Sequence, residues 1–137
     1  MELRKAKTPD EMAKIERAVA LKKLSYCTTA QVATDHYEYD RLYVVAEGEK
    51  ILAILSLVPE KEYGYTAVKR LCILNKKNQG KGIARFALHE IQKVVNGRIG
   101  GTPWIDNAPV RHLFESEGFT LLYIFNEKWC FYAKDCN

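Results

Sequence analysis

The sequence predicts a mixed α/β domain in which a mostly antiparallel sheet of about seven strands carries helices on both faces. Short apolar runs of strand length alternate along the chain with segments whose apolar residues recur at helical spacing. No internal repeat or Pro/Ser-rich linker divides the 137 residues, so we expect one domain over 1–137. Apolar residues make up 47% of the chain, which is enough to form a core.

The chain begins with a short strand, ELRKA, that leads into a capped helix. Thr8, Pro9 and Glu11 occupy the positions of an N-cap, a first-turn proline and a capping box. Apolar residues at helical spacing extend this helix to about Leu24. The segment 25–40 is polar and rich in tyrosine, and it is compatible with a short helix.

Three strands and a helix are expected in the middle of the chain. RLYVVAEGEKILAILSLVP indicates two strands joined by a tight turn at 47–49, and YTAVKRLCIL is a third strand that ends at Asn75. From Gly82 onward the apolar residues again recur at helical spacing, and the pair Asn96-Gly97 is expected to end this helix.

The last third of the chain adds three strands and a helix. RIGGTPW is expected to be a strand, although its two glycines weaken the pattern. Asn107 is placed to cap a helix from Ala108 to Glu117, and Gly118 stops it. FTLLYIF and KWCFYAKD close the chain as two strands joined at 126–127.

Charge and composition exclude several classes of protein. The net charge of +4 is mild and both signs are interspersed, so a nucleic-acid partner is not expected. The densest basic cluster, which fits a small anion better than a polymer, is Lys76, Lys77, Lys81 and Arg85. No apolar run reaches the ~18 residues of a membrane span, and the first residues lack a secretion signal, so we expect no membrane partner and a cytoplasmic location. The four cysteines form no CxxC pair and the three histidines are scattered, so no metal site is expected.

The stretch NKKNQGKGIARFALHE has the pattern of an anion-binding site. A strand ends in a glycine-rich turn that opens a helix, whose first N–H groups have no intrahelical partners. The stretch does not match the Walker A pattern, because no glycine lies five positions before Gly80. It also lacks the third glycine of a Rossmann fingerprint and follows the fourth strand rather than the first.

The pattern Gln79-x-x-Gly82-x-Ala84 resembles the acetyl-CoA motif of the GNAT N-acetyltransferase superfamily, Gln/Arg-x-x-Gly-x-Gly/Ala, which lies between that family's fourth strand and third helix. A second match follows in DNAPVRHLFESEGF, where an Asn, an aromatic residue and a Gly-Phe pair have the family spacing. The order of elements over residues 2–134 also fits. The sequence is therefore similar to GNAT enzymes across nearly its whole length.

The resemblance implies an acetyl-CoA-dependent N-acetyltransferase that moves an acetyl group directly to an amine acceptor of unknown identity. The acceptor is expected to be a small molecule or a peptide, with acetyl-CoA as co-substrate and no metal. The alternative is a catalytically weak or inactive GNAT-like module that binds acyl-CoA. By resemblance, the loop amides hold the pyrophosphate, the fourth strand pairs with pantetheine and polarises the acetyl carbonyl, and Asn107 reaches the pantetheine arm. The residues assigned to the cofactor are Cys72, Ile73, Leu74, Gln79, Gly80, Lys81, Gly82, Ile83, Ala84, Asn107 and Phe114.

The catalytic residues stay unknown, because the sequence departs from the family where a general acid is expected. Phe114 stands where many members have a tyrosine that is thought to protonate the leaving thiolate, and phenylalanine has no proton to give. Tyr123 and Tyr132 are candidate substitutes, but strand tyrosines packed at a core edge are the better interpretation of both.

A general base is equally open. Some members carry a glutamate on the fourth strand, whereas residues 65–74 contain no acidic residue. Glu60 and Glu62 precede this strand and could act through a water, or they are solvated loop charges. His36 is a weaker candidate, although histidine is a side-chain type commonly used as a general base.

The segment SYCTTAQVATDHYEYD is expected to carry acceptor specificity, since this region shapes the acceptor pocket in the family. Its tyrosines are compatible with a pocket or with the core. Its acidic residues Asp35, Glu38 and Asp40 suit a cationic acceptor such as a polyamine, an aminoglycoside or a lysine side chain, and they are equally compatible with solvated charges. The aromatic-rich C-terminal strands and the edge after the fifth strand leave a homodimer open.

Overall fold

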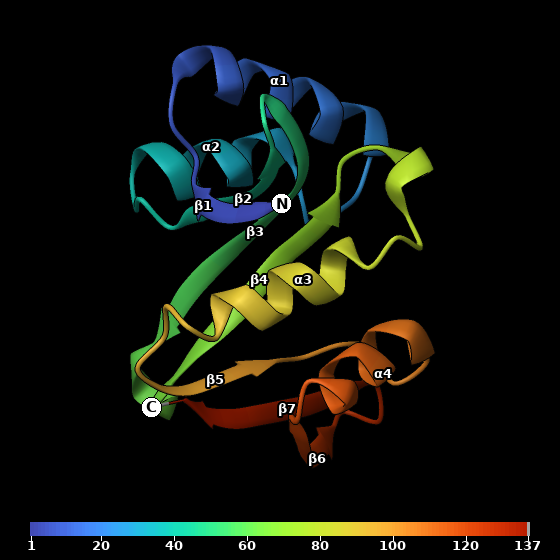
Figure 1. Ribbon diagram of the computed structural model, residues 1–137. Coiled ribbons are helices and arrows are strands. Elements are labelled where there is room, and N and C mark those ends of the chain that lie inside the picture. The colour runs from blue at the N-terminus through green and yellow to red at the C-terminus, as the bar shows by residue number, and fades with distance from the viewer. Residues whose placement is uncertain (137) are drawn as a thin grey trace. The chain divides into compact units, whose positions relative to one another are not determined.

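The structure is a computed structural model that describes residues 1–136, and its elements follow the predicted order (Figure 1). Its strands are β1 (Glu2–Lys5), β2 (Leu42–Glu47), β3 (Lys50–Glu60), β4 (Tyr65–Ile73), β5 (Gly97–Gly101), β6 (Thr120–Phe125) and β7 (Trp129–Cys136). Its α-helices are α1 (Pro9–Lys22), α2 (Thr29–Tyr37), α3 (Ile83–Ile91) and α4 (Ala108–Ser116). Two short 3-10 helices, η1 (Lys61–Tyr63) and η2 (Lys76–Asn78), were not expected from the sequence.

The seven strands form one mixed sheet in the order β1-β2-β3-β4-β5-β7-β6. β4 and β5 pair in parallel, whereas β1 with β2, β2 with β3, β5 with β7 and β6 with β7 pair antiparallel. Val44 and Val45 point to opposite faces of β2, and both are fully buried, so the sheet is covered on both faces there. The predicted fold class is confirmed.

The chain packs as two compact units, each made of two segments. Unit 1 comprises Met1–Leu57 and Lys69–Ala87, and unit 2 comprises Val58–Val68 and the chain from Leu88 onward. The expectation of a single domain stays a prediction. Among residues 1–136, no helix is long and apolar enough to cross a membrane.

The core of unit 1 forms where α1 and α2 bury their apolar faces against the strands. Thr8 caps α1 by accepting a hydrogen bond from Glu11 N, as predicted. Thr28 and Gln31 form a reciprocal capping box that starts α2, the short helix expected in this segment. The buried cluster comprises Ala6, Met12, Ile15, Val19, Cys27, Val32, Leu42, Val44, Ala46, Ile54 and Cys72.

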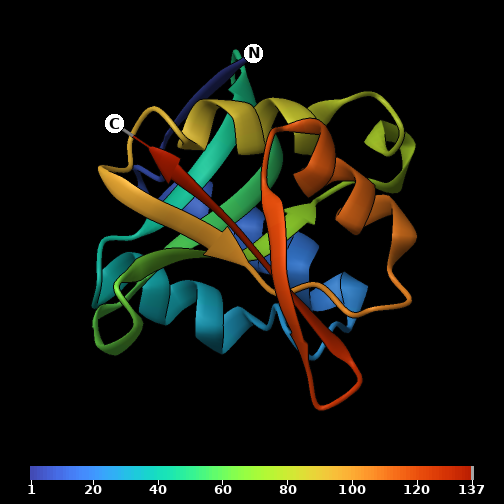
Figure 2. The same cartoon turned by 90° about the horizontal axis from the view of Figure 1, so that it is seen from below.

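Unit 2 is built around the antiparallel strands β5, β7 and β6. β6 and β7 form the predicted hairpin, which turns at Asn126 and Glu127 (Figure 2). Tyr132 on β7 is fully buried and stacks on Phe114 of α4, at 5.6 Å between ring centroids. The pleat therefore directs one face of β7 at α4 and leaves much of β6 exposed.

The predicted end of α3 at Asn96-Gly97 is wrong, because the helix stops at Ile91. The N–H groups of Lys93 and Val94 bond to the carbonyls three residues earlier, which tightens the chain into a turn. The apolar pattern continues through this turn, so spacing alone did not reveal the end of the helix.

Arg4 and Glu11 join β1 to α1 through a two-pronged contact. Arg4 Nη1 and Nη2 donate to Glu11 Oε1 and Oε2 at 2.9 and 2.8 Å, and Lys7 N–H donates to Oε1 at 3.0 Å. The hydrogen bonds from Arg4 are the main reason that the pKa of Glu11 lies below its ordinary value.

We predict that Glu11→Gln lowers the free energy of unfolding by about 1–2 kcal/mol at neutral pH. Because folding lowers the pKa of Glu11, its stabilisation is complete well above the ordinary value of 4.5 and is lost as the pH falls through the folded-state pKa. The gap between wild type and variant, measured by urea unfolding, should therefore close on acidification. Glu49→Gln, in the exposed β2–β3 turn, should follow the wild-type profile. A gap that is constant with pH contradicts the assignment.

Candidate functional site

The loop between β4 and α3 has the backbone that an anion site needs. Gly80 and Gly82 both have φ of 76°, the left-handed region that favours glycine, and a Cβ at either position would meet nothing within 4 Å. η2 precedes them, stabilised by Asn75 Oδ1, which accepts from Lys77 N–H at 3.1 Å. The loop thus leaves open space directly above its main chain.

The start of α3 lies at the end of this loop. Phe86 N–H donates to Gly82 O at 3.0 Å, so Gly82 is the residue that caps the helix, and the amides of Ile83, Ala84 and Arg85 form its first turn. Gln79, Gly80, Lys81 and Gly82 are all exposed. Amides at a helix start attract anions through both hydrogen bonds and the helix dipole, and nearby lysines add positive charge.

At the end of β4, the backbone N–H and C=O of Ile73 point away from β3. Leu74 N–H donates to Leu52 O of β3 at 3.0 Å. Because N–H and C=O of successive strand residues alternate between the two edges, Ile73 turns its own pair to the opposite edge. Of the three strand residues assigned to pantetheine, Ile73 is therefore best placed, and the N–H of Leu74 is already used.

Cys72 packs inside unit 1, as expected for a strand residue, and it forms a thiol pair with Cys27. The hydrogen bond from the Cys27 thiol lowers the pKa of Cys72, while the same contact and burial raise the pKa of Cys27. Burial, followed by the charges of these two thiols, raises the pKa of Tyr26. These contacts bring the start of the predicted acceptor segment next to β4, which the sequence did not indicate.

The two predicted residues of α4 both have local structural roles. Asn107 caps the helix, its Oδ1 accepting from Val110 N–H at 3.3 Å, so a role toward pantetheine falls to its –NH₂ group. Phe114 is 5% exposed and contacts Phe119 edge to face at 5.0 Å. Gly118, with φ of 86°, ends the helix. The Gly-Phe part of the motif therefore shapes the end of α4.

Tyr132 does not offer a free hydroxyl as a substitute acid. Its Oη donates to Glu115 Oε2 at 2.6 Å and accepts from Arg111 Nε at 3.1 Å, and burial raises its pKa. Tyr123 is 57% exposed and its ring tilts against Phe131. The interpretation of Tyr132 as a packed strand residue is confirmed.

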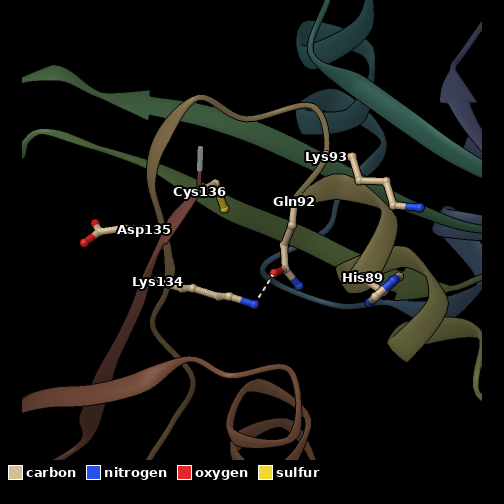
Figure 3. Close-up of a pocket in the computed structure, with 6 residues that line it drawn as sticks. All are labelled: His89, Gln92, Lys93, Lys134, Asp135 and Cys136. Carbon is tan, nitrogen blue, oxygen red and sulfur yellow. Dashed lines mark hydrogen bonds between the residues drawn. The ribbon is translucent and has the colours of Figure 1, made fainter.

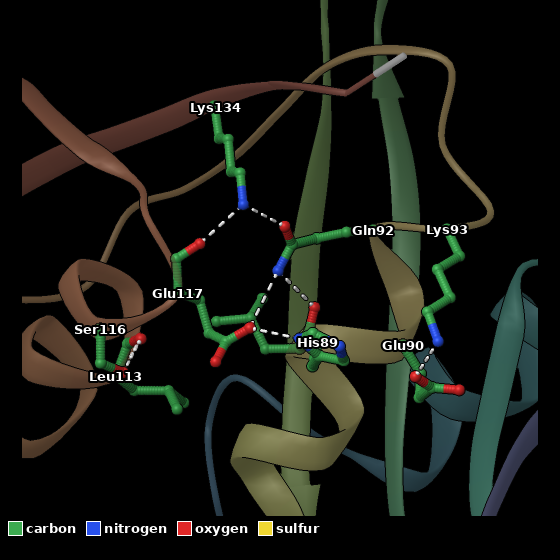
Figure 4. Close-up of polar contacts among 9 residues, drawn as sticks. His89, Glu90, Gln92, Lys93, Leu113, Ser116, Glu117 and Lys134 are labelled. Atoms are coloured by element: carbon green, nitrogen blue, oxygen red, sulfur yellow. Dashed lines mark hydrogen bonds and ion pairs between the residues drawn. The ribbon is translucent and has the colours of Figure 1, made fainter.

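Unit 2 also holds an open cavity of about 330 Å³ that contains none of the predicted site residues (Figure 3). It is lined by His89, Gln92, Lys93, Lys134, Asp135 and Cys136. Lys134 Nζ donates to Gln92 Oε1 and to Glu117 O, both at 2.8 Å, and His89 Nδ1 lies 2.9 Å from Glu117 Oε1 (Figure 4). These bonds tie α3 and β7 to the end of α4, which indicates a structural role.

Both interpretations of Asp35 are wrong, since this carboxylate is neither solvated nor open to an acceptor. It is fully buried, Arg41 Nε donates to Oδ1 at 2.8 Å, and Ser56 Oγ donates to Oδ2 at 2.6 Å. Asp40 is exposed and pairs with Lys5. The tyrosines of the segment are exposed rather than in the core: Tyr26 by 55%, Tyr37 by 61% and Tyr39 by 58%.

No protein-family model and no curated protein sequence matches the chain. Solved structures do match over nearly the whole length. A GNAT-family acetyltransferase from Bacillus cereus superposes with a TM-score of 0.81 at 14% identity, covering 99% of this chain and 97% of that one.

The chain has the GNAT fold. An aminoglycoside 6′-N-acetyltransferase solved with coenzyme A gives a TM-score of 0.77 at 10% identity, over 98% of this chain and 96% of that one. The NatC complex bound to Gag peptide and coenzyme A gives a TM-score of 0.69 at 14% identity, covering 100% of this chain and 99% of that one. In this chain the segment that the sequence motif singled out is the loop after β4 and the start of α3.

We predict that Gly101→Ala destabilises the protein by about 1–3 kcal/mol, because the added Cβ would overlap Phe114 Cζ. Urea unfolding measures the change. In a Phe114→Leu background the ring is absent, so the same substitution should cost less, and a double-mutant cycle gives the difference. Equal costs in the two backgrounds would mean that the ring does not press on Gly101.

Proposed function

We propose that the chain is an acetyl-CoA-dependent N-acetyltransferase that transfers acetyl directly to an amine. The observation that carries this proposal is the exposed start of α3, where two left-handed glycines open the backbone to an anion in a chain with the GNAT fold. The residues present fit coenzyme A, because the loop offers main-chain donors, open space and lysines together.

Acetyl-CoA, when bound, supplies an acetyl group activated as a thioester. The amides from Gln79 to Ala84 would hold its pyrophosphate, with Lys81 adding attraction over a longer range. Ile73 would pair with pantetheine through its backbone, as an added strand would. Asn107, the N-cap of α4, would reach the pantetheine arm, and Phe114 of α4 would belong to the cofactor site, as the resemblance implies.

The reaction needs two proton transfers, one from the attacking amine and one to the leaving thiolate. The amine must lose a proton to attack, and Glu60 or Glu62, at the junction of β3 and η1, would accept it through a water. Glu62 is exposed. Phe114 gives no proton, and the hydroxyl of Tyr132 is engaged by α4. The catalytic residues stay unassigned.

The acceptor class is proposed from the solved neighbours and from the exposed tyrosines of the acceptor segment. Those neighbours include an aminoglycoside acetyltransferase and a peptide-bound complex, so both small-molecule and peptide amines are candidates here. Half-exposed tyrosine rings suit an amine with apolar character, and aromatic faces also attract cations. The homodimer and the cytoplasmic location stay predictions.

The second candidate is an acyl-CoA-binding module with little or no turnover. It is favoured by Phe114 and by the absence of acidic residues from β4. Both candidates bind acetyl-CoA, but only the enzyme releases free thiol faster when an amine is added. A panel of a polyamine, an aminoglycoside and a lysine-containing peptide would separate them.

We predict that acetyl-CoA at about 100 times its dissociation constant stabilises the protein by about 2.7 kcal/mol, a shift of several degrees in thermal unfolding. ATP at equal concentration, which also carries phosphates, should give a much smaller shift. No shift, or equal shifts with both compounds, would remove the proposal.

We also predict that Gly82→Asp abolishes acetyl-CoA binding while the fold survives, because a side chain and a negative charge would occupy the space for the pyrophosphate. Gly48→Asp is the matched control: Gly48 has φ of 60°, also with nothing within 4 Å of an added Cβ, and it lies in the β2–β3 turn. Both variants carry similar backbone strain and the same charge. Titration calorimetry should detect binding only in the control, and unchanged binding by Gly82→Asp would show that the phosphate site is elsewhere.

A further inference from the structure

Asp35 is a fully buried charge that holds three segments of unit 1 together. Arg41, before β2, and Ser56, on β3, donate to its two carboxylate oxygens. Arg70, on β4, brings its Nε to 3.0 Å from Oδ2, and the Arg70 side chain is only 15% exposed. A buried carboxylate needs such partners, because leaving water without them is strongly unfavourable.

The backbone of Arg70 is as unusual as its side-chain contact. Its φ of 54° lies in the left-handed region, although it is within β4 and is not a glycine. An L-residue adopts this conformation only when the surroundings hold it there. A left-handed residue kinks a strand and turns the neighbouring peptide groups out of the ladder. Among the described residues Arg70 Nε is buried and forms no hydrogen bond, so its link to Asp35 at 3.0 Å is a charge attraction, and this attraction anchors the side chain on α2.

The kink lies just before Ile73, which the proposed function pairs with pantetheine, in the strand that the resemblance assigns to the acetyl carbonyl. We infer that Asp35 is a positioning residue: acting through Arg70, it fixes the kink of β4 and so aims the backbone N–H of Ile73, which points away from β3, at the thioester of acetyl-CoA. This inference rests on the proposed function. Donors that are aimed before the reaction stabilise charge developing on the acetyl oxygen without reorganising during it.

Arg70→Ala and Arg70→Gly form the decisive pair of variants. Both remove the ion pair and leave Asp35 with Arg41 and Ser56, but only glycine adopts φ of 54° without strain. In a regular strand glycine is the less favourable of the two residues. We therefore expect kcat to fall by roughly 10- to 100-fold in Arg70→Ala and by much less in Arg70→Gly. Equal losses, or a larger loss with glycine, overturn the inference.

Asp35→Asn and Arg41→Ala separate positioning from stability. Asp35→Asn removes the charge that holds Arg70 and should lower kcat in the same way as Arg70→Ala. Arg41→Ala weakens the same buried cluster but leaves the contact between Asp35 and Arg70. It should lower the urea midpoint while kcat changes by no more than about twofold. If kcat instead follows the urea midpoint across all four variants, the role is structural and the inference fails.

Measurements on the wild type separate a failure of the proposed acetyltransferase function from a failure of the positioning role. If the wild type binds acetyl-CoA and releases thiol with an amine, but Arg70→Ala and Arg70→Gly have equal kcat, only the positioning role is overturned. Wild type that binds acetyl-CoA without thiol release overturns both the enzyme and the positioning role but leaves the binding site intact. Wild type without acetyl-CoA-dependent stabilisation overturns the whole assignment.

Discussion

The burial of one carboxylate, that of Asp35, fixes how α2, β3 and β4 come together in unit 1. The rest of this core is apolar, and apolar contacts tolerate small shifts of one element over another. The hydrogen bonds to Asp35 from Ser56 at 2.6 Å and from Arg41 at 2.8 Å depend on direction and tolerate such shifts less well, and the charge of Arg70 lies 3.0 Å from the same carboxylate. The contacts of Asp35 therefore fix the relative positions of elements that apolar burial alone would hold less specifically. They do so beside the strand proposed to bind the acyl group.

The order of the elements was predictable because its signals are local. A cap such as Thr8, the tight turn at Gly48 and the short apolar run of β2 are each recognised within a few residues. The end of α3 was not predictable, because Val94 and Val95 continue the apolar spacing after the helix has ended. There the chain tightens into a turn and enters β5. The position of this turn depends on how β5 pairs in the sheet rather than on local sequence preference.

The candidate site divides in the same way. Gly80 and Gly82 could be singled out from the sequence because left-handed backbone at the start of a helix favours glycine. The pairs Asp35–Arg70 and Cys27–Cys72 could not, because their members are 35 and 45 residues apart in the sequence and meet only when α2 or its preceding loop docks on β4. Asp35 was misinterpreted because its partners Arg41, Ser56 and Arg70 come from other parts of the chain, and only the folded structure shows that they surround a buried carboxylate.

Phe114 shows where the chemistry of this chain would have to come from. Its ring tip lies against Gly101, its face stacks on Tyr132 and it meets Phe119 edge to face, so a packed ring stands where a tyrosine could give a proton. A thiolate leaving group tolerates this loss better than an alkoxide, since a thiol such as that of cysteine has a pKa of about 8.5 and water can protonate it. With no side-chain acid at position 114, more of any rate enhancement must come from orienting the thioester against backbone donors. In unit 1 that orientation depends on a strand kink held by a buried ion pair.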